Sequence, residues 1–162
     1  MSKEIIWQPS KEQIENSKLT KFIQHCKLKN YDELEKKSFS DPGWLWDNVI
    51  KFSDLKFYKP YSKILDESKG TPWTRWCIGG KTNIVLNCID RHKDKEFFNN
   101  TFIFAEREDG KESSITYKEF DKQISKVGNT LKINGFKKGD VIALYMPQFI
   151  ETYIAYFAIL KI

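Results

Sequence analysis

The chain has 162 residues, a length that is typical of one domain and sufficient to bury a hydrophobic core. Its composition, with 40% hydrophobic and 15% aromatic residues, excludes an intrinsically disordered chain. The net charge of +5 comes from lysines that are interleaved with acidic residues, and this dispersal argues against a nucleic-acid-binding surface, which usually concentrates its basic residues on one face.

The first hundred residues have the pattern of helices and loops. A capping-box pattern at Ser10 precedes apolar residues at helical spacing and predicts a helix over residues 11–26. A Ser-Asp-Pro start signal predicts a second helix over residues 40–52. Proline and glycine then recur, so we expect residues 53–73 to form a wrapping loop with aromatic anchors. Together these features predict an N-terminal extension over residues 1–100.

The pattern changes after this extension. Two β-type runs around a Glu-Asp-Gly-Lys turn predict a hairpin over residues 101–116. A capping box from Thr116 to Glu119 begins a predicted helix that Gly135 ends. The continuous apolar run at residues 141–146 is typical of a strand buried on both faces of a parallel sheet. The expected fold class is α/β: a helix-and-loop N-terminal extension followed by a β-hairpin, a helix and the first strand of an incomplete parallel sheet.

The sequence ends inside an apolar helix that begins near Phe149 and has no capping residue. A parallel strand needs its neighbour to be supplied after a crossover helix, so the predicted sheet is incomplete as written. Unpaired strand backbone and a bare apolar helix face favour association or poor solubility. We therefore expect marginal stability in isolation unless a partner completes the sheet.

Residues 83–92 carry a dense polar pattern with two interpretations. In one, Asp90 and His92 form an acid–base pair. In the other, which we favour, the residues form a structural network that pins the extension to the following domain, with Asn83 as a helix cap. The set comprises Asn83, Asn87, Asp90, Arg91 and His92.

Two further patterns have weak functional interpretations. The Gly79-Gly80 pair favours a turn where backbones approach closely over a phosphate-binding nest. A metal site made of Cys77, Cys88 and His92 would have only three ligands, at spacings unlike those of structural zinc, and we reject it.

Four tryptophans could stack a base or cofactor ring, but we favour their packing as the apolar area that holds the extension down. These are Trp44, Trp46, Trp73 and Trp76.

The sequence contains neither a P-loop nor a Gly-x-Ser-x-Gly nucleophile motif. We therefore assign the chain no catalytic residue, no cofactor-binding residue and no metal-binding residue.

The cysteines and the apolar segments indicate a location. Cys26, Cys77 and Cys88 are an odd set without a C-x-x-C pair, and the first residues lack the apolar core of a signal peptide. The apolar stretch at residues 149–162 is shorter than the ~20 residues that a membrane span needs. We expect a cytoplasmic protein with neither a nucleic acid nor a membrane as its partner.

Four segments, in this order and spacing, resemble one enzyme family. They are Trp73-Thr-Arg-Trp-Cys-Ile-Gly-Gly-Lys-Thr-Asn83, Asn87-Cys-Ile-Asp-Arg-His92, Ile115-Thr-Tyr-Lys-Glu119 and Lys138-Gly-Asp-Val-Ile-Ala-Leu-Tyr-Met-Pro147. The family is the acetyl-CoA synthetase group of AMP-forming acyl-CoA synthetases, within the adenylate-forming superfamily. Earlier residues, including Trp7, Pro9 and Tyr31, look more like the acetoacetyl-CoA synthetase branch.

The resemblance implies an organisation and an activity for a longer parent enzyme. Residues 1–100 would be the extension typical of the group, and residues 101–162 the start of the AMP-binding (adenylation) domain. The parent would be an acid–CoA ligase that forms an acyl-adenylate from ATP and a short acid such as acetate or acetoacetate, and then an acyl-CoA thioester. ATP, magnesium and coenzyme A are implied for that parent and none of them for this chain, whose sequence stops before the ATP-binding motifs and lacks the catalytic ones.

Two hypotheses about the chain itself follow. It is either an N-terminal fragment of such a ligase, inactive alone, or a non-catalytic interaction module or split-enzyme subunit. In the second case the expected partner is the remainder of the synthetase or another synthetase subunit.

Overall fold

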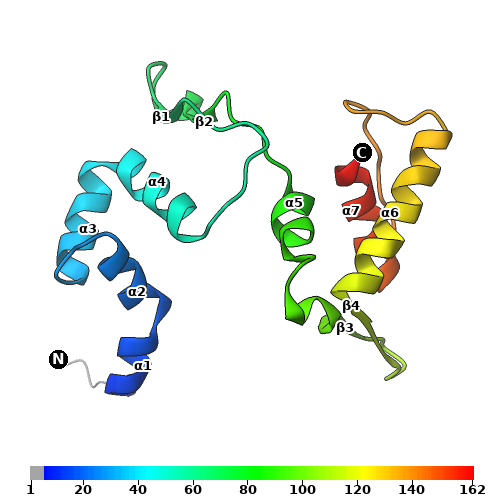
Figure 1. Ribbon diagram of the computed structural model, residues 1–162, viewed down its shortest axis with the longest axis horizontal. Coiled ribbons are helices and arrows are strands. Elements are labelled where there is room, and N and C mark those ends of the chain that lie inside the picture. Colours follow the sequence, from blue (N-terminus) through cyan, green and yellow to red (C-terminus); the bar gives the residue numbers. More distant parts are fainter. Residues whose placement is uncertain (1–5) are drawn as a thin grey trace. The chain divides into compact units, whose positions relative to one another are not determined.

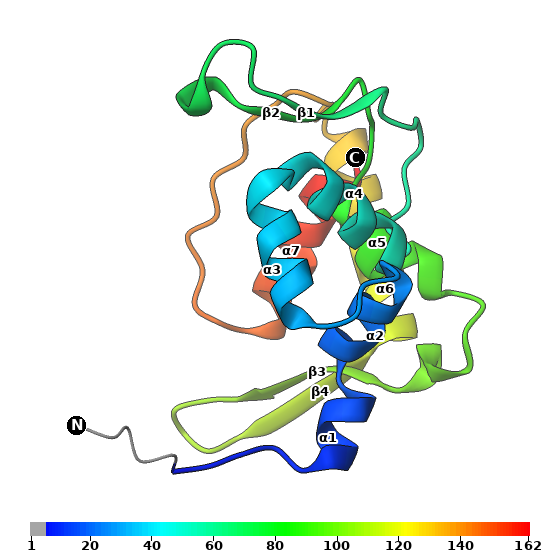
Figure 2. The same cartoon turned by 90° about the vertical axis from the view of Figure 1, so that its left-hand side faces the viewer.

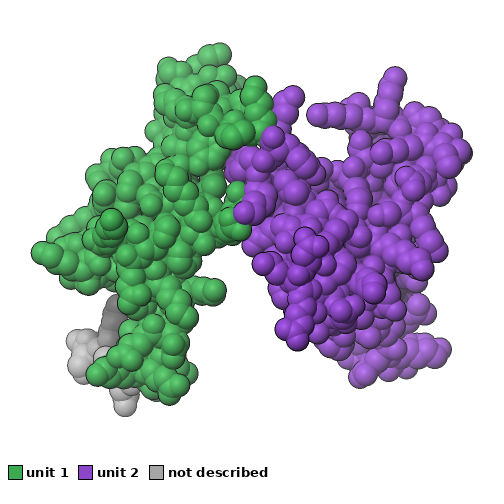
Figure 3. Space-filling view, viewed as in Figure 1, with its two compact units in different colours: residues 1–55, 59–80 green, residues 56–58, 81–162 purple. Residues whose placement is uncertain are grey.

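A computed structural model describes residues 6–162 (Figure 1). The chain divides into two compact units, which are coloured separately in Figure 3. The first unit comprises the residues up to 55 together with 59–80, and the second comprises 56–58 together with 81–162. Each unit is described by itself below. The predicted division of the chain near residue 100 into an extension and an adenylation domain stays a prediction.

The first unit begins with two short helices where one was expected. α1 spans Lys11–Asn16 and α2 spans Lys18–His25. The Ser10 capping box is present, with both of its hydrogen bonds. The break occurs at Ser17, whose backbone is extended and whose hydroxyl accepts a hydrogen bond from the Thr20 amide. The prediction of one helix over residues 11–26 is therefore wrong, because Ser17 caps a new helix in its middle.

Two more helices complete the helical part of this unit. α3 spans Tyr31–Ser40 and was not anticipated, although Asn30 caps it through its side chain. α4 spans Pro42–Phe52, as the Asp-Pro start signal predicts, and the Asp41 side chain accepts from the Trp44 amide. The ring of Phe52 packs edge-on against that of Phe22, with centroids 5.3 Å apart.

A small antiparallel hairpin follows the helices. β1 (Lys63–Asp66) pairs with β2 (Arg75–Ile78), and the 3-10 turn η1 (Thr71–Trp73) lies between them. The expected loop over residues 53–73 therefore contains a strand that the sequence analysis missed. A hydrogen bond from the Tyr61 hydroxyl to Asp47 Oδ1 (2.6 Å) ties the hairpin to α4. Burial first, and then the Asp47 carboxylate, raise the pKa of Tyr61 to about 12.

The tryptophans do not form the packed core that was predicted for them. Trp73 is 69% exposed, and Trp46 and Trp76 are both nearly half exposed. Trp46 and Trp76 contact each other edge-on, with ring centroids 6.0 Å apart. Trp44 lies beneath the Lys37 ammonium, 4.1 Å from the ring centroid. The core-packing interpretation is wrong for Trp73 because a two-stranded hairpin has no second layer to cover the ring.

The second unit contains the predicted hairpin and helices. α5 (Ile84–Cys88), η2 (Asp90–His92) and η3 (Glu96–Asn99) precede the antiparallel strands β3 (Thr101–Glu106) and β4 (Glu112–Thr116). Gly110 supplies the positive φ of the turn between them. α6 (Tyr117–Ile133) begins with the Thr116 capping box, and α7 (Ile150–Lys161) closes the described chain.

The core of this unit is formed where α5, η3, α6 and α7 meet. α6 and α7 run side by side (Figure 1). Their close approach depends on Gly128, because a Cβ there would lie 3.2 Å from the Ile162 side chain and 3.6 Å from the Ala158 carbonyl oxygen. The buried hydrophobic residues are Val85, Ile89, Phe98, Phe120, Ile124 and Ala158.

The expected strand at residues 141–146 does not form. These residues pass as a plain trace between α6 and α7 (Figure 2), and in the described part of the chain they make no backbone hydrogen bond. Val141 is 96% exposed and Tyr145 fully so. The prediction is wrong for a physical reason: a strand exists only when a neighbour pairs with it. We call residues 141–146 the open segment.

The fold class is nevertheless mixed helix and sheet, as expected. Within residues 6–162 both sheets are antiparallel pairs, β1–β2 and β3–β4. The α/β interpretation is confirmed at this level, whereas the parallel sheet that it included is not seen among the described residues.

Candidate functional site

Asn83 and Asn87 hold α5 in place within the second unit. The Asn83 side chain accepts from the Val85 amide (2.8 Å), so the residue is the helix cap that was predicted. Its Nδ2 donates to the Leu160 carbonyl oxygen of α7 (2.6 Å). The Asn87 side chain accepts from the Lys56 amide (2.7 Å) and donates to its carbonyl oxygen (3.0 Å). Both asparagines therefore join segments that are distant in sequence.

Asp90 belongs to a cluster of four charged residues. They come from η2, from the residue that follows it, from α6 and from α7. We call this set the charge cluster, and it comprises Asp90, Lys93, Asp121 and Lys161. Lys93 Nζ lies 2.7 Å from Asp90 Oδ1 and 3.2 Å from Asp121 Oδ2. Lys161 Nζ lies 2.8 Å from Asp121 Oδ1 and 3.7 Å from Asp90 Oδ1. The two carboxylates and the two ammonium groups neutralise one another, as a structural lock requires.

The pKa shifts in the charge cluster fit this role. Burial alone would raise the pKa of Asp121, but the hydrogen bonds from Lys161 and Lys93 bring it below its ordinary value. Burial alone would lower the pKa of Lys93, but its bonds to Asp90 and Asp121 raise it. Asp121 and Lys93 are thus held in their charged forms, whereas a general acid or base must exchange its proton near neutral pH.

His92 has different contacts from Asp90. Its ring packs against Phe97 and Tyr117, at centroid distances of 5.2 and 6.4 Å. Arg91 Nε donates to His92 Nε2 (3.3 Å). Burial lowers the pKa of His92, and the positive charges of Arg91 and Lys95 lower it further. Within residues 6–162 no hydrogen bond or ion pair joins His92 to a carboxylate, which favours the structural interpretation of residues 83–92.

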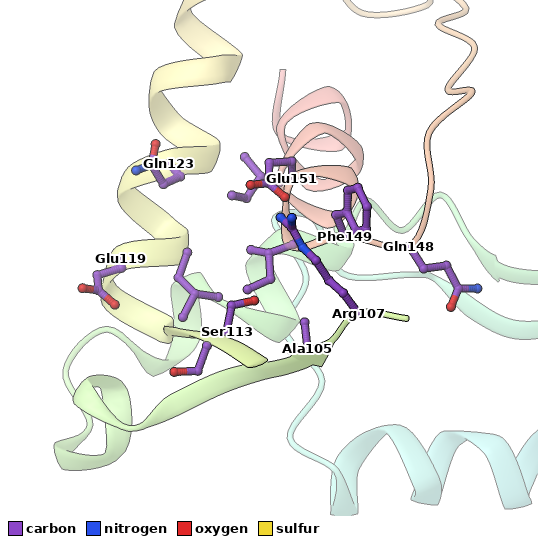
Figure 4. Close-up of a pocket in the computed structure, with 12 residues that line it drawn as sticks. Ala105, Arg107, Ser113, Glu119, Gln123, Gln148, Phe149 and Glu151 are labelled. Atoms are coloured by element: carbon purple, nitrogen blue, oxygen red, sulfur yellow. The ribbon is translucent and has the colours of Figure 1, made fainter. Parts of the chain in front are cut away.

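A pocket of about 510 Å³ lies where the β3–β4 hairpin meets the starts of α6 and α7 (Figure 4). Arg107 extends from the end of β3 toward α7, with its guanidinium 4.6 Å from the Phe149 ring. Glu119 also lines the pocket, but its carboxylate is occupied by the Thr116 cap. Gln148 and Glu151 also lie on its polar side, as do Ser113 and Ser114. The pocket can hold a small polar group, but neither serine hydroxyl has a hydrogen bond to a base among the described residues.

The cysteines and Gly79 complete the positions that the sequence singled out. No group of three potential metal ligands gathers among residues 6–162. Burial raises the pKa of the Cys26 and Cys77 thiols, which disfavours the reactive thiolate. Gly79 has a positive φ of 74° in the turn after β2, so the pair Gly79-Gly80 serves a turn.

Among residues 6–162, no helix combines the length and the hydropathy that a membrane crossing needs.

Three members of the charge cluster, Lys93, Asp121 and Lys161, were missed by sequence reasoning. The available signal was weak: Lys93 follows Asp90 at a helical spacing of three, and Lys161 interrupts the apolar run of α7. Neither feature indicates which distant residue is the partner.

Comparison with known proteins gives two adjacent family matches. Residues 31–88 match the family described as acetyl-coenzyme A synthetase N-terminus, and residues 87–162 match the family described as AMP-binding enzyme. Together the two matches run without a gap to the last residue.

Curated relatives are acetyl-coenzyme A synthetases. That of Methanothrix soehngenii is 34% identical over 97% of this chain and 24% of the relative. That of Helicobacter pylori (strain G27) is 36% identical over 81% of this chain and 20% of the relative. The chloroplastic/glyoxysomal form of Arabidopsis thaliana is 34% identical over 82% of this chain and 18% of the relative. The chain thus spans about a quarter or less of the length of the curated relatives it matches.

A solved structure shares the fold. Acetoacetyl-CoA synthetase from Streptomyces lividans matches with a TM-score of 0.83 over 98% of this chain and 25% of that chain, at 19% sequence identity.

Proposed function

The chain belongs to the acetyl-CoA synthetase group of AMP-binding enzymes, whose N-terminal region it matches, and from this premise we propose that it forms the N-terminal part of an acid–CoA ligase. The observation that carries the proposal is the unbroken succession of the two family matches along the chain. A chance match to one short motif would not reproduce this order.

The proposed reaction has two steps. The carboxylate of a short acid attacks the α-phosphorus of ATP, so that an acyl-adenylate forms and pyrophosphate leaves. The thiol of coenzyme A then attacks the acyl carbon, and AMP leaves with the bonding electron pair while the thiol proton is released. Acetate and acetoacetate are the acids to test, since the sequence relatives are acetyl-CoA synthetases and the fold relative is an acetoacetyl-CoA synthetase.

Within this ligase we give the chain a structural role. The contacts of Asn83, Asn87 and the charge cluster hold α5, α6 and α7 together, and none of the described pockets contains a catalytic set. We place the sites for ATP, magnesium and coenzyme A outside this chain, and we expect the chain alone to be inactive. The cytoplasm is the proposed location, in keeping with its three free cysteines.

The test is acid- and ATP-dependent pyrophosphate release with acetate and with acetoacetate. It compares this chain alone with a chimera in which the chain replaces the matching quarter of the Methanothrix soehngenii relative. We expect no release from the chain and release from the chimera. An inactive but folded chimera would refute the proposed role, and activity from the chain alone would refute the placement of the catalytic groups.

A second candidate is an interaction module without a catalytic parent. The open segment favours it, because its residues are uncharged and mostly exposed, and backbone that no described residue pairs with can receive a partner strand. The chimera separates the two candidates, since only the first predicts pyrophosphate release.

A further inference from the structure

The end of α6 carries an asparagine that is followed directly by glycine. The pair is Asn134-Gly135, and every other asparagine in the sequence precedes a residue with a side chain. Asn134 is the C-cap residue of α6, and both residues of the pair are exposed. Asparagine is a thermolabile residue, and a following glycine has no Cβ to hinder its own nitrogen from attacking the asparagine side chain. The pair therefore has a reactivity that the other asparagines lack.

The local geometry leaves this reaction open. Gly135 has a φ of +89°, and a Cβ built there would meet no atom within 4 Å, so the space around the attacking residue is empty. The Asn134 side chain is held by a hydrogen bond from its Nδ2 to the Thr130 carbonyl oxygen (2.8 Å). Helix ends open at a free-energy cost close to zero. Breaking this exposed bond is therefore enough to free the side chain, without any change in the core.

A second dipeptide of the same type is protected. Asp109-Gly110 lies in the turn of the β3–β4 hairpin, and an aspartate before glycine can form the same ring. Lys111 Nζ, however, lies 2.8 Å from Asp109 Oδ2, and the Lys111 amide donates to Asp109 Oδ1 (3.2 Å). These hydrogen bonds lower the pKa of Asp109 and keep it as a carboxylate. A carboxylate resists nucleophilic attack, so the structure favours reaction at Asn134 over Asp109.

We propose that Asn134 is a site of spontaneous deamidation. The Gly135 nitrogen gives up its proton to solvent and attacks Asn134 Cγ, so that a bond from nitrogen to Cγ forms, the bond from Cγ to Nδ2 breaks, and ammonia leaves. One water then opens the resulting succinimide ring. Cleavage of the bond between nitrogen and Cγ gives aspartate, and cleavage at the backbone carbonyl gives isoaspartate, whose main chain runs through Cγ.

The modification would alter the bonds that end α6. The Gly135 amide donates to the Lys132 carbonyl oxygen (3.0 Å) and the Phe136 amide to that of Leu131 (3.1 Å), which is the Schellman arrangement. Isoaspartate adds a carbon to the main chain just before both donors and moves them out of register. Either product also loses the Nδ2 donor and places a negative charge at a helix C-terminus, where the helix dipole disfavours it. We expect the last turn of α6 to open.

The test is incubation of the 162-residue chain at neutral pH, followed by peptide mapping. A synthetic peptide with the sequence of residues 131–138 gives the rate without a folded structure. Mass spectrometry locates the exchange of NH for oxygen, and methylation by S-adenosylmethionine with an isoaspartyl methyltransferase identifies isoaspartate.

Gly135→Ala adds a Cβ beside the attacking nitrogen. Gly139→Ala is the matched control, because Gly139 is also exposed, has a positive φ of 101° and has empty space around its Cβ position, but follows a lysine. Both variants thus place alanine in the same kind of backbone conformation, and one of them leaves the Asn-Gly pair intact.

We expect conversion at Asn134 ahead of every other asparagine, within roughly tenfold of the rate in the peptide, since a helix end opens easily. Gly135→Ala should slow it roughly tenfold or more, because of the added Cβ, and Gly139→Ala should leave the rate unchanged. In the converted chain the amides of residues 131–136 should exchange faster with solvent. Exchange at residues 120–128 should stay as it was, because the buried residues of α6 lie there, before its last turn.

Other outcomes overturn the proposal. An Asn134 that stays intact while the peptide converts would show that the helix cap protects it. Faster conversion at another asparagine or at Asp109 would place the reactive site elsewhere. A wild-type rate in Gly135→Ala, or an equal loss of rate in Gly139→Ala, would show that access to the Gly135 nitrogen does not control the reaction. Unchanged exchange at residues 131–136 after conversion would refute the effect on α6.

Discussion

The charge cluster gives a prediction whose size follows from its geometry. Lys161→Met removes the ammonium group that lies 2.8 Å from Asp121 and leaves Lys93 as the cation that faces both carboxylates. Exposed ion pairs contribute about 0–1 kcal/mol, and breaking a fully buried pair costs about 3–5 kcal/mol. The side chains of Lys161 and Asp121 are 24% and 20% exposed, between these limits. We therefore expect the second unit to lose about 1–2 kcal/mol of its unfolding free energy.

The assay must report the two units separately, and the chain allows this. All five tryptophans lie in the first unit. These are Trp7, Trp44, Trp46, Trp73 and Trp76. Tryptophan fluorescence follows the first unit during urea unfolding, while amide hydrogen exchange in α6 follows the second. With an m value of about 1–3 kcal/mol/M, the midpoint of the second unit should fall by roughly 0.3–2 M. The fluorescence midpoint should not move.

Lys126→Met is the matched control, since Lys126 lies on α6 and enters none of the ion pairs found among residues 6–162. It should leave both midpoints unchanged. The reasoning is refuted if Lys161→Met leaves the exchange of α6 as it was, or if Lys126→Met has an equal effect.

The cluster also predicts a pH dependence. The folded pKa of Asp121 is below its unfolded value, because the hydrogen bonds from Lys161 and Lys93 outweigh the effect of burial. This contribution is therefore complete above the unfolded pKa of about 4 and is lost as the pH falls through the folded pKa. The difference in stability between wild type and Lys161→Met should be constant from pH 6 to 8 and should shrink in acid.

Three further predictions concern the second unit. Ile124→Ala should cost about 2–5 kcal/mol in urea unfolding because Ile124 is fully buried, whereas Ile133→Ala, at an exposed site, should cost less than about 0.5 kcal/mol. Asn83→Ala should lose both the cap of α5 and the bond to Leu160, about 1–2 kcal/mol, seen as faster amide exchange in α5. NMR titration should place the pKa of His92 below the ordinary value of about 6.5, so its contribution to stability is present above that pH and declines as the pH falls through the folded pKa; a raised pKa would contradict the burial of its ring.

Sequence reasoning succeeded where the structure depends on neighbours along the chain. The Thr116 capping box, the turn at Gly110 and the cap at Asn83 each use partners within three residues. Their patterns are visible in the sequence for that reason. The missed break at Ser17 is also local, but Ser17 competes with the helical periodicity around it, and periodicity was given priority.

Two other failures concern contacts between distant residues. Nothing in the local sequence of Asp121 indicates that it meets Lys161, because the pairing depends on how α6 packs against α7. The open segment shows the opposite case. Its composition favours a strand, but composition does not supply a partner: no described residue forms a backbone hydrogen bond with residues 141–146, and the strand is absent.

The missed charge cluster and the missing strand at residues 141–146 are related, because the cluster shows how the second unit is stabilised without the strand. Because the open segment pairs with no described residue, the second unit is held together elsewhere: by the buried cluster around Phe120 and by the four charges that bridge η2, α6 and α7. Neither set of contacts uses the open segment, whose side chains are exposed. The helices of the second unit can therefore stay packed while the side chains of the open segment stay exposed to solvent. Substitutions in the charge cluster should then lower the stability of the second unit, whereas substitutions of exposed side chains in the open segment should leave that stability unchanged.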